Sequence, residues 1–161
     1  MPSDAERFLD AVARSKSIHQ PWLAPPRDAQ AFGAYLERIR SDDCYGFLVC
    51  LETDDCLVGT VNLNEVVRGC FQSAYLAYYV FHPYERKGLM TEGLKLVLQY
   101  AFTSLGLHRL EANIQPENSA SIALAKRCGF EKEGYSKRYL KIGDRWRDHE
   151  RWAILKETCR S

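Results

Sequence analysis

HPYERKGLMTEG, at positions 82–93, and PENSASIALAKRCGF, at positions 116–130, carry the strongest structural signal in this chain. The first segment joins a turn containing Gly88 to an apolar helix. The second places Asn118 and Ser121 at the start of another helix, which ends at Gly129 and Phe130. A tight turn that leads into a helix exposes backbone N–H groups, and the helix dipole adds partial positive charge there. Both segments therefore predict binding of a phosphate or diphosphate group.

Composition restricts the possible classes of protein. A length of 161 residues predicts one domain over 1–161, and the apolar share of 46% is typical of a folded globular protein. A net charge of +1 gives no electrostatic reason to expect nucleic acid or membrane as a partner. The six cysteines have no C-x-x-C spacing, so we expect no metal site and a reducing, cytoplasmic location.

Apolar periodicity and turn residues predict a mixed α/β fold. Helical spacing is found at 5–14 and, after the possible N-cap Asp28, at 28–40, and the connection at 19–26 is broken by prolines. The remaining segments predict strands at 46–51, 57–63, 75–81, 110–114, 135–142 and 146–154, and helices at 90–105 and 119–128. The resulting order, ααβββαβαββ, predicts a mixed sheet with helices on both faces.

Two ordered motifs and a long tail resemble a known family. Gly88-Leu89-Met90-Thr91-Glu92, followed by Asn118-x-x-Ser121 and Gly129-Phe130, resembles the GCN5-related N-acetyltransferase (GNAT) superfamily. The tail GFEKEGYSKRYLKIGDRWRDHE, from Gly129 to Glu150, is similar to the RimJ/RimL-like ribosomal-protein N-acetyltransferases. The resemblance covers residues 57 to 155 well and the first 50 residues loosely. Such proteins usually begin with one more strand, which this chain lacks or replaces with another segment.

The resemblance implies that acetyl-CoA is the co-substrate. Its diphosphate would be bound by the backbone amides of the loop Arg86, Lys87, Gly88, Leu89, Met90 and Thr91. Glu85 and Arg86 depart from the side chains usual in this pattern. Because amides do most of the binding, these departures should weaken affinity rather than abolish it. From the residues alone, an ordinary strand-to-helix turn with solvated charges is the alternative.

The resemblance also assigns the strand that faces the acetyl group. Tyr78, Tyr79 and Val80 match the strand whose backbone contacts the acetyl group and the pantetheine arm, with an amide that stabilises the oxyanion. They would serve equally as core residues of a central strand. Asn118 would contact the pantetheine arm, or act only as an N-cap.

Two residues are candidates for proton transfer. Ser121, at the start of its helix, would sit near the cofactor sulfur and protonate the departing thiolate; otherwise it is a small residue at a crowded helix start. Glu111 matches a glutamate proposed as the general base in similar enzymes. An α-amine with a pKa of about 8 is largely protonated at pH 7, so a group must accept its proton. A salt bridge, for instance with Arg109, is the alternative for Glu111.

The acceptor side is less well defined by the sequence. Tyr135 and Tyr139 would line the acceptor end, or are ordinary strand aromatics. His149, between Asp148 and Glu150, would position an amine, or belongs to a surface charge cluster. Residues of the segment NEVVRG, Asn64 and Arg68 among them, would touch the acceptor or only shape a turn.

These residues predict acetyl-CoA-dependent N-acetyl transfer to a primary amine in a ternary complex. The resemblance implies the N-terminal α-amine of a ribosomal protein as the acceptor. A small-molecule acceptor (an antibiotic, a polyamine or an amino acid) and a non-catalytic acyl-CoA-binding domain remain alternatives. We expect no metal, and a monomer or homodimer.

Overall fold

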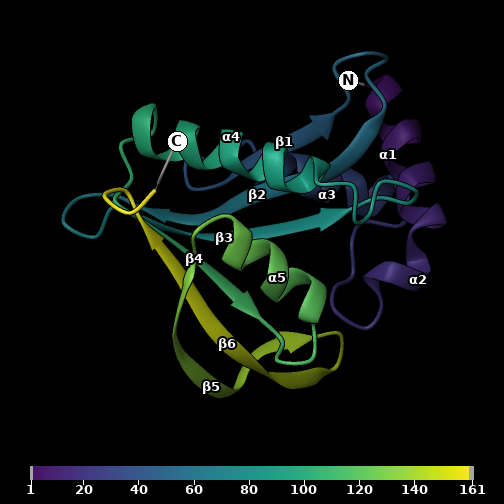
Figure 1. Ribbon diagram of the computed structural model, residues 1–161. Helices are drawn as coiled ribbons and strands as arrows, with labels where there is room; N and C mark the ends of the chain where they lie inside the picture. Colours follow the sequence, from purple (N-terminus) through teal and green to yellow (C-terminus); the bar gives the residue numbers. More distant parts are fainter. Residues whose placement is uncertain (1, 160–161) are drawn as a thin grey trace.

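The computed structural model describes residues 2–159 and contains one six-stranded sheet with helices on both faces (Figure 1). The helices are α1 (Pro2–Arg14), α2 (Lys16–His19), α3 (Ala29–Arg38), α4 (Leu89–Thr103) and α5 (Ser119–Arg127). The strands are β1 (Tyr45–Cys50), β2 (Leu57–Val67), β3 (Ser73–Val80), β4 (Arg109–Ile114), β5 (Glu131–Ile142) and β6 (Arg145–Leu155).

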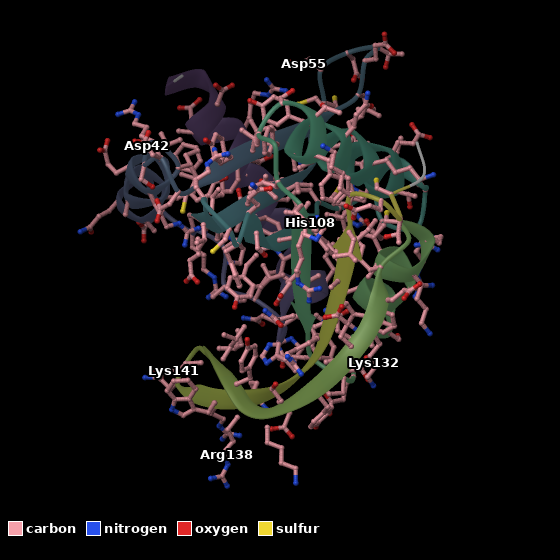
Figure 2. The ribbon with its side chains drawn as sticks, turned by 90° about the vertical axis from the view of Figure 1, so that its left-hand side faces the viewer. Asp42, Asp55, His108, Lys132, Arg138 and Lys141 are labelled. Carbon is pink, nitrogen blue, oxygen red and sulfur yellow. The ribbon has the colours of Figure 1, made fainter. Side chains whose placement is uncertain are left out.

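The sheet has the strand order β1-β2-β3-β4-β6-β5. All neighbours are antiparallel except β3 and β4, which run parallel. A parallel pair needs a long crossover, and α4 supplies it between these two strands. The long β5–β6 hairpin forms one side of the sheet. Figure 2 shows Lys132, Arg138 and Lys141 on this hairpin, with Arg138 directed away from the rest of the molecule.

Each face of the sheet has its own apolar core. α4 and α5 pack on one face, where Leu94, Leu98 and Leu110 are essentially inaccessible to solvent. α1 and α3 pack on the other face around Phe8, which is fully buried among aromatic rings. Burying an aromatic side chain of this size contributes about 2–3 kcal/mol to stability. The sheet, including its β3–β4 region, therefore lies between two helical layers.

The observed order confirms the predicted α/β fold class and adds one helix. α2, with four residues, follows the predicted helix at 5–14 and ends at His19, the first residue of the predicted proline-broken connection, where the sequence indicated no helix. One turn of helix is too short to show apolar periodicity, which explains why the pattern did not predict it. Asp28 caps α3 as expected, since its carboxylate accepts from the Ala31 amide at 2.8 Å. Within residues 2–159, no strand precedes α1.

Candidate active site

The parallel strands β3 and β4 separate along their length. They pair only where Ser73–Tyr75 lies opposite Arg109–Glu111. Beyond this point β3 continues to Val80 beside β2, and β4 continues to Ile114 beside β6. Residues 76–80 and 112–114 therefore face each other without strand pairing, and we call this region the β3–β4 split.

Two backbone amides of β3 point into the β3–β4 split. The Phe81 amide donates to the Val58 carbonyl at 2.7 Å, continuing the antiparallel β2–β3 register. In an antiparallel ladder, successive residues direct their N–H groups alternately to the two sides. The amides of Tyr79 and Phe81 thus point to β2, and those of Tyr78 and Val80 point away from it. Either of the latter two can donate to a carbonyl oxygen bound in the split.

The loop from β3 to α4 has the geometry of an anion site. Its backbone is left-handed at Arg86 (φ 60°) and Gly88 (φ 79°). The Thr91 amide donates to the Gly88 carbonyl at 2.9 Å, and this bond begins α4. The amides of Leu89 and Met90 precede the first helical hydrogen bond and point out of the positive end of the helix. A diphosphate can accept hydrogen bonds from these groups.

The side chains of this loop do not add a simple positive patch. Glu85 Oε1 lies 2.8 Å from His82 Nδ1, and this contact lowers the pKa of the Glu85 carboxyl. The carboxylate is therefore ionised at neutral pH and adds one negative charge beside the loop. The Lys87 ammonium lies over the Tyr84 ring, 5.5 Å from its centroid. That backbone amides supply most of the attraction for an anion stays a prediction.

The N-terminus of α5 lies across the helix-side face of the split. The Asn118 side chain accepts from the Ser121 amide at 3.2 Å, so the predicted N-cap is present. The Ser121 hydroxyl donates to the Tyr78 hydroxyl at 3.0 Å, and the Tyr78 hydroxyl donates to the Ser121 carbonyl at 3.1 Å. Burial raises the pKa of Tyr78 to about 12, so the phenol keeps its proton at neutral pH.

Glu111 lies where β3 and β4 begin to separate. Its Oε1 is 2.7 Å from Arg109 Nε, which is the salt bridge left open by the sequence. Arg109 also forms two hydrogen bonds with Glu133 of β5. The Glu133 and Glu111 contacts raise the pKa of Arg109 above its usual value, so the guanidinium stays charged. The carboxylate of Glu111 is held in place by this network, and its role as a base stays a prediction.

Three of the predicted acceptor residues lie, like Glu111, on the face of the sheet opposite α4 and α5. Tyr75 of β3 pairs with Asn64 of β2. The pKa of Tyr75 is raised to about 12, mainly by a hydrogen bond to Tyr139. The Tyr139 ring is 6.3 Å from the His149 ring. His149 is buried, its Nδ1 lies 2.9 Å from the Arg147 carbonyl, and burial lowers its pKa. Tyr139 thus interacts with both Tyr75 and His149, and Asn64 lies opposite Tyr75 in the β2–β3 register.

The other two predicted acceptor residues lie apart from this group. Arg68 donates to the Leu105 carbonyl just beyond α4 and to the Tyr45 hydroxyl at 3.2 Å. Tyr135 is 46% exposed, and its hydroxyl donates to the Asp148 carboxylate at 2.7 Å. The structure therefore does not bring Arg68 or Tyr135 together with Glu111 and Ser121.

Three side chains beside the split were missed by sequence reasoning. The Tyr78 hydroxyl could have been found from strand alternation, which places it on the same face as Leu76 and Val80. His19 Nε2 lies 2.7 Å from the Val80 carbonyl, and Gln115 donates to the Trp22 carbonyl at 3.0 Å. These last two contacts join segments far apart in the sequence, and no local pattern indicates them.

Comparison with known proteins identifies the family. The Acetyltransferase (GNAT) domain model matches residues 1–131. This chain belongs to the GNAT acetyltransferase family. Accordingly, this GNAT protein is an N-acetyltransferase, and its six-stranded sheet is the GNAT fold.

Two of three similar relatives of this GNAT protein are named after their acceptors. It is 35% identical over 160 residues to the [Ribosomal protein uS5]-alanine N-acetyltransferase of Escherichia coli, covering 94% of this chain and 82% of the relative. It is 41% identical over 121 residues to the "Probable N-acetyltransferase YjcK" of Bacillus subtilis, covering 75% and 67%. It is 26% identical over 151 residues to the spermidine N(1)-acetyltransferase of Vibrio cholerae, covering 92% and 86%.

A solved structure agrees with the fold of this GNAT protein. RimJ of Mycobacterium smegmatis, in complex with CoA-disulfide, superposes with a TM-score of 0.86 at 29% sequence identity. The match covers 96% of this chain and 78% of that one. Within residues 2–159, no cluster of His, Cys, Asp and Glu could hold a metal ion. None of the helices in the same range has the length and apolar character to cross a bilayer.

Proposed function

We propose that this GNAT protein transfers the acetyl group of acetyl-CoA to the N-terminal α-amine of a protein, a ribosomal protein in particular. One observation carries the proposal: the β3–β4 split, with two inward-pointing amides, lies beside the N-termini of both α4 and α5. The donor therefore has an anion site at one end and hydrogen-bond donors for a thioester at the other. The 35% identity to the uS5-alanine enzyme supports the choice of acceptor.

Acetyl-CoA fits the groups that line this path. The amides of the loop Arg86–Thr91 would bind its diphosphate, and Asn118 would contact the pantetheine arm. The thioester carbonyl would accept from the amide of Tyr78 or Val80, which points into the split. When bound, acetyl-CoA supplies the activated acetyl group. The chain's own part is to orient that group and to stabilise charge on its oxygen.

The reaction then needs one proton removed and one supplied. The acceptor amine loses a proton as it bonds to the acetyl carbon, and the CoA sulfur gains one as the C–S bond breaks. We assign proton removal to Glu111, directly or through water, with Arg109 holding its carboxylate. We assign the proton for sulfur to the Ser121–Tyr78 hydroxyl pair, because their hydrogen bond connects the α5 N-terminus to the split.

A polyamine is the second candidate acceptor. The specific observation in its favour is the match to a spermidine acetyltransferase over 92% of this chain. The carboxylates of Glu111 and Glu133 would suit a cationic amine, although Arg109 already neutralises part of their charge. For either acceptor we expect a cytoplasmic location, consistent with six cysteines that are all free thiols.

The acceptor can be decided by measuring CoA release. The amines to compare are a peptide with the N-terminal sequence of ribosomal protein uS5, spermidine, free alanine and lysine. The same uS5 peptide with a blocked N-terminus is the matched control. We expect the highest kcat/KM with the free uS5 peptide and no turnover with the blocked one. Faster turnover of spermidine than of the peptide would contradict the ribosomal acceptor and favour the polyamine. An inert enzyme with every amine would contradict the proposed function.

A further inference from the structure

A short segment, Ser15–Trp22, connects the two sides of the β3–β4 split, and we call it the bridge segment. On the β3 side, His19 Nε2 lies 2.7 Å from the Val80 carbonyl. On the β4 side, the Gln115 side chain donates to the Trp22 carbonyl at 3.0 Å. Gln115 directly follows β4. The two strands that separate from each other are therefore both attached to the same few residues.

The bridge segment also binds the start of the loop that connects β3 to α4. Ser15 is fully buried, and its hydroxyl accepts from the His82 amide at 2.9 Å while donating to the Ala11 carbonyl at 2.6 Å. Together with the His19 contact, this fixes the backbone on both sides of Phe81. The residues so held join the end of β3, where we place the acetyl group, to the loop where we place the diphosphate.

The hydrogen bond from His19 replaces a missing strand partner. Val80 does not pair with β4, and its carbonyl, like its amide, points into the split. A carbonyl only accepts, so His19 must carry its proton on Nε2. His19 is only 3% exposed, and its ring lies 5.1 Å from the Tyr79 ring and 5.9 Å from the Phe81 ring. Packing against these two rings thus holds the donor at the strand end.

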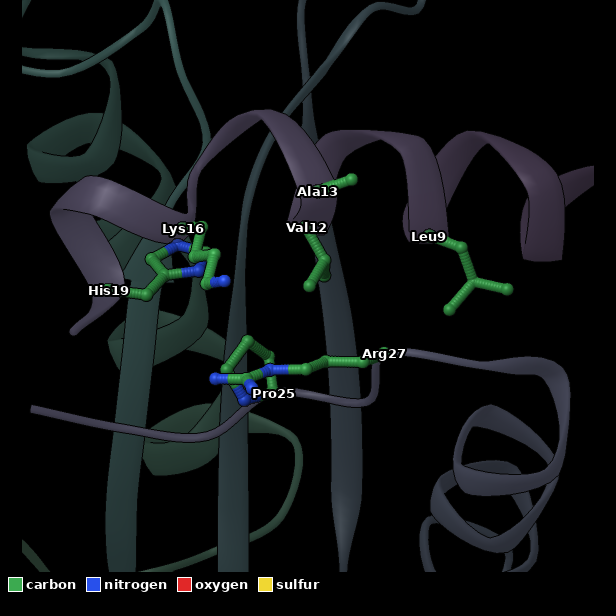
Figure 3. A pocket seen from close by; sticks show the side chains of 7 residues that line it. All are labelled: Leu9, Val12, Ala13, Lys16, His19, Pro25 and Arg27. Carbon is green, nitrogen blue, oxygen red and sulfur yellow. The ribbon is translucent and has the colours of Figure 1, made fainter. Parts of the chain in front are cut away.

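The other ring nitrogen makes no competing contact among the described residues. His19 Nδ1 is buried without a hydrogen-bond partner in that part of the chain. Figure 3 shows the ring beside Lys16 at one end of a cavity of about 160 Å³ between α1 and the segment that carries Pro25 and Arg27. Burial lowers the pKa of His19, so the ring is neutral near pH 7. Within residues 2–159, the polar contact between His19 and the site is the bond to the Val80 carbonyl.

We propose that His19 is a positioning residue for acetyl transfer. Its hydrogen bond holds the end of β3 so that the amides of Tyr78 and Val80 stay aimed at the thioester oxygen. Gln115 fixes the far end of the bridge segment and thereby the separation of β3 and β4. This inference rests on the proposed function. Misplacing reacting groups by 1 Å costs up to about 100-fold in rate, so a single bond at this position is enough to matter.

The test compares two substitutions of His19 that differ in one property. His19→Leu removes the donor and keeps an apolar side chain, whereas His19→Gln keeps an N–H at a similar distance. We expect His19→Leu to lower kcat roughly 10- to 100-fold with the KM for acetyl-CoA changed less than about threefold. His19→Gln should stay within about threefold of the wild type, with the same pH profile. Phe102→Leu, which loosens the core at the C-terminal end of α4 and away from the bridge segment, should lower the melting temperature and leave kcat unchanged.

Other results would overturn the inference. A His19→Leu enzyme with the wild-type kcat would show that the bond does not position the strand. A His19→Gln enzyme as slow as His19→Leu, with an altered pH profile, would make His19 a titrating catalyst instead. Wild-type protein inert with every amine would contradict the proposed function itself. Amide hydrogen exchange at Phe81 and His82, whose amides are hydrogen-bonded to Val58 and Ser15, needs no turnover: it should be faster in His19→Leu than in His19→Gln, and equal exchange would overturn the positioning role. If His19→Leu does not fold, Gln115→Leu replaces it in the test and should also lower kcat. A Gln115→Leu enzyme with the same kcat as the wild type would contradict the role of the bridge segment.

Discussion

At the scale of single residues, the structure pairs the hydroxyl of Ser121, the predicted acid, with the hydroxyl of Tyr78. The sequence indicated Ser121 from its place at a helix start, and gave Tyr78 only a backbone role. In the structure the two hydroxyls are 3.0 Å apart, so either one can pass a proton toward the sulfur while the other supports it. With its pKa raised to about 12, the Tyr78 phenol does not ionise between pH 7 and 10.

Removing either hydroxyl should slow the chemical step. For Tyr78→Phe, which keeps the backbone amide and most of the buried surface, we expect kcat to fall roughly 10- to 100-fold with little change in the KM for acetyl-CoA. Ser121→Ala should behave in the same way, and the double variant should lose much less than the product of the two effects, because both act on one proton. Steady-state kinetics at pH 7 and pH 9 provides the measurement. A loss confined to KM would make this pair a binding feature only.

At the scale of secondary structure elements, the β3-to-α4 connection carries the proposed anion site. The turn residues and the helix start were predictable because Gly88 and the apolar spacing of α4 are local signals. The left-handed backbone at Gly88 (φ 79°) confirms that the turn requires unusual geometry. No protein atom would lie within 4 Å of an added Cβ there, so space on the protein side is not the limiting factor. The backbone conformation and the approach of a ligand are what restrict this position.

A substitution pair in this connection tests whether backbone or side chain binds the donor. Gly88→Val should raise the dissociation constant for acetyl-CoA more than tenfold, since a β-branched residue strongly disfavours a positive φ. Lys87→Ala should raise it less than about threefold, because it removes one exposed charge over the Tyr84 ring. Isothermal titration with acetyl-CoA gives both affinities directly. If the lysine variant were the weaker binder, side-chain charge rather than the amide cradle would hold the diphosphate.

At the scale of the whole molecule, the sequence predicted most helices and strands but few of the contacts between them. Ten of the elements followed from apolar spacing and turn residues, and α2 did not because one helical turn has no period. The predicted cofactor residues of β3, the loop and α5 surround one region because neighbouring strands and their helices bring them there. By contrast, the contacts of His19 with Val80 and of Gln115 with Trp22 span 61 and 93 residues and depend on how α1 and α2 pack. The sequence placed Arg68 at the acceptor side because a short segment such as NEVVRG does not indicate where its side chains point. In the structure, the Arg68 side chain points to the end of α4.

The central claim is that backbone N–H groups of the β3–β4 split and of the start of α4 bind acetyl-CoA. Amide chemical shifts measured during a titration with acetyl-CoA test this claim most directly. With acetyl-CoA, we predict large shifts at Tyr78, Val80, Leu89 and Met90. Adenosine 3′,5′-bisphosphate, which lacks the diphosphate and the pantetheine arm, should leave Tyr78 and Val80 unmoved. Bound acetyl-CoA that leaves all four amides in place, with shifts elsewhere, would contradict this account.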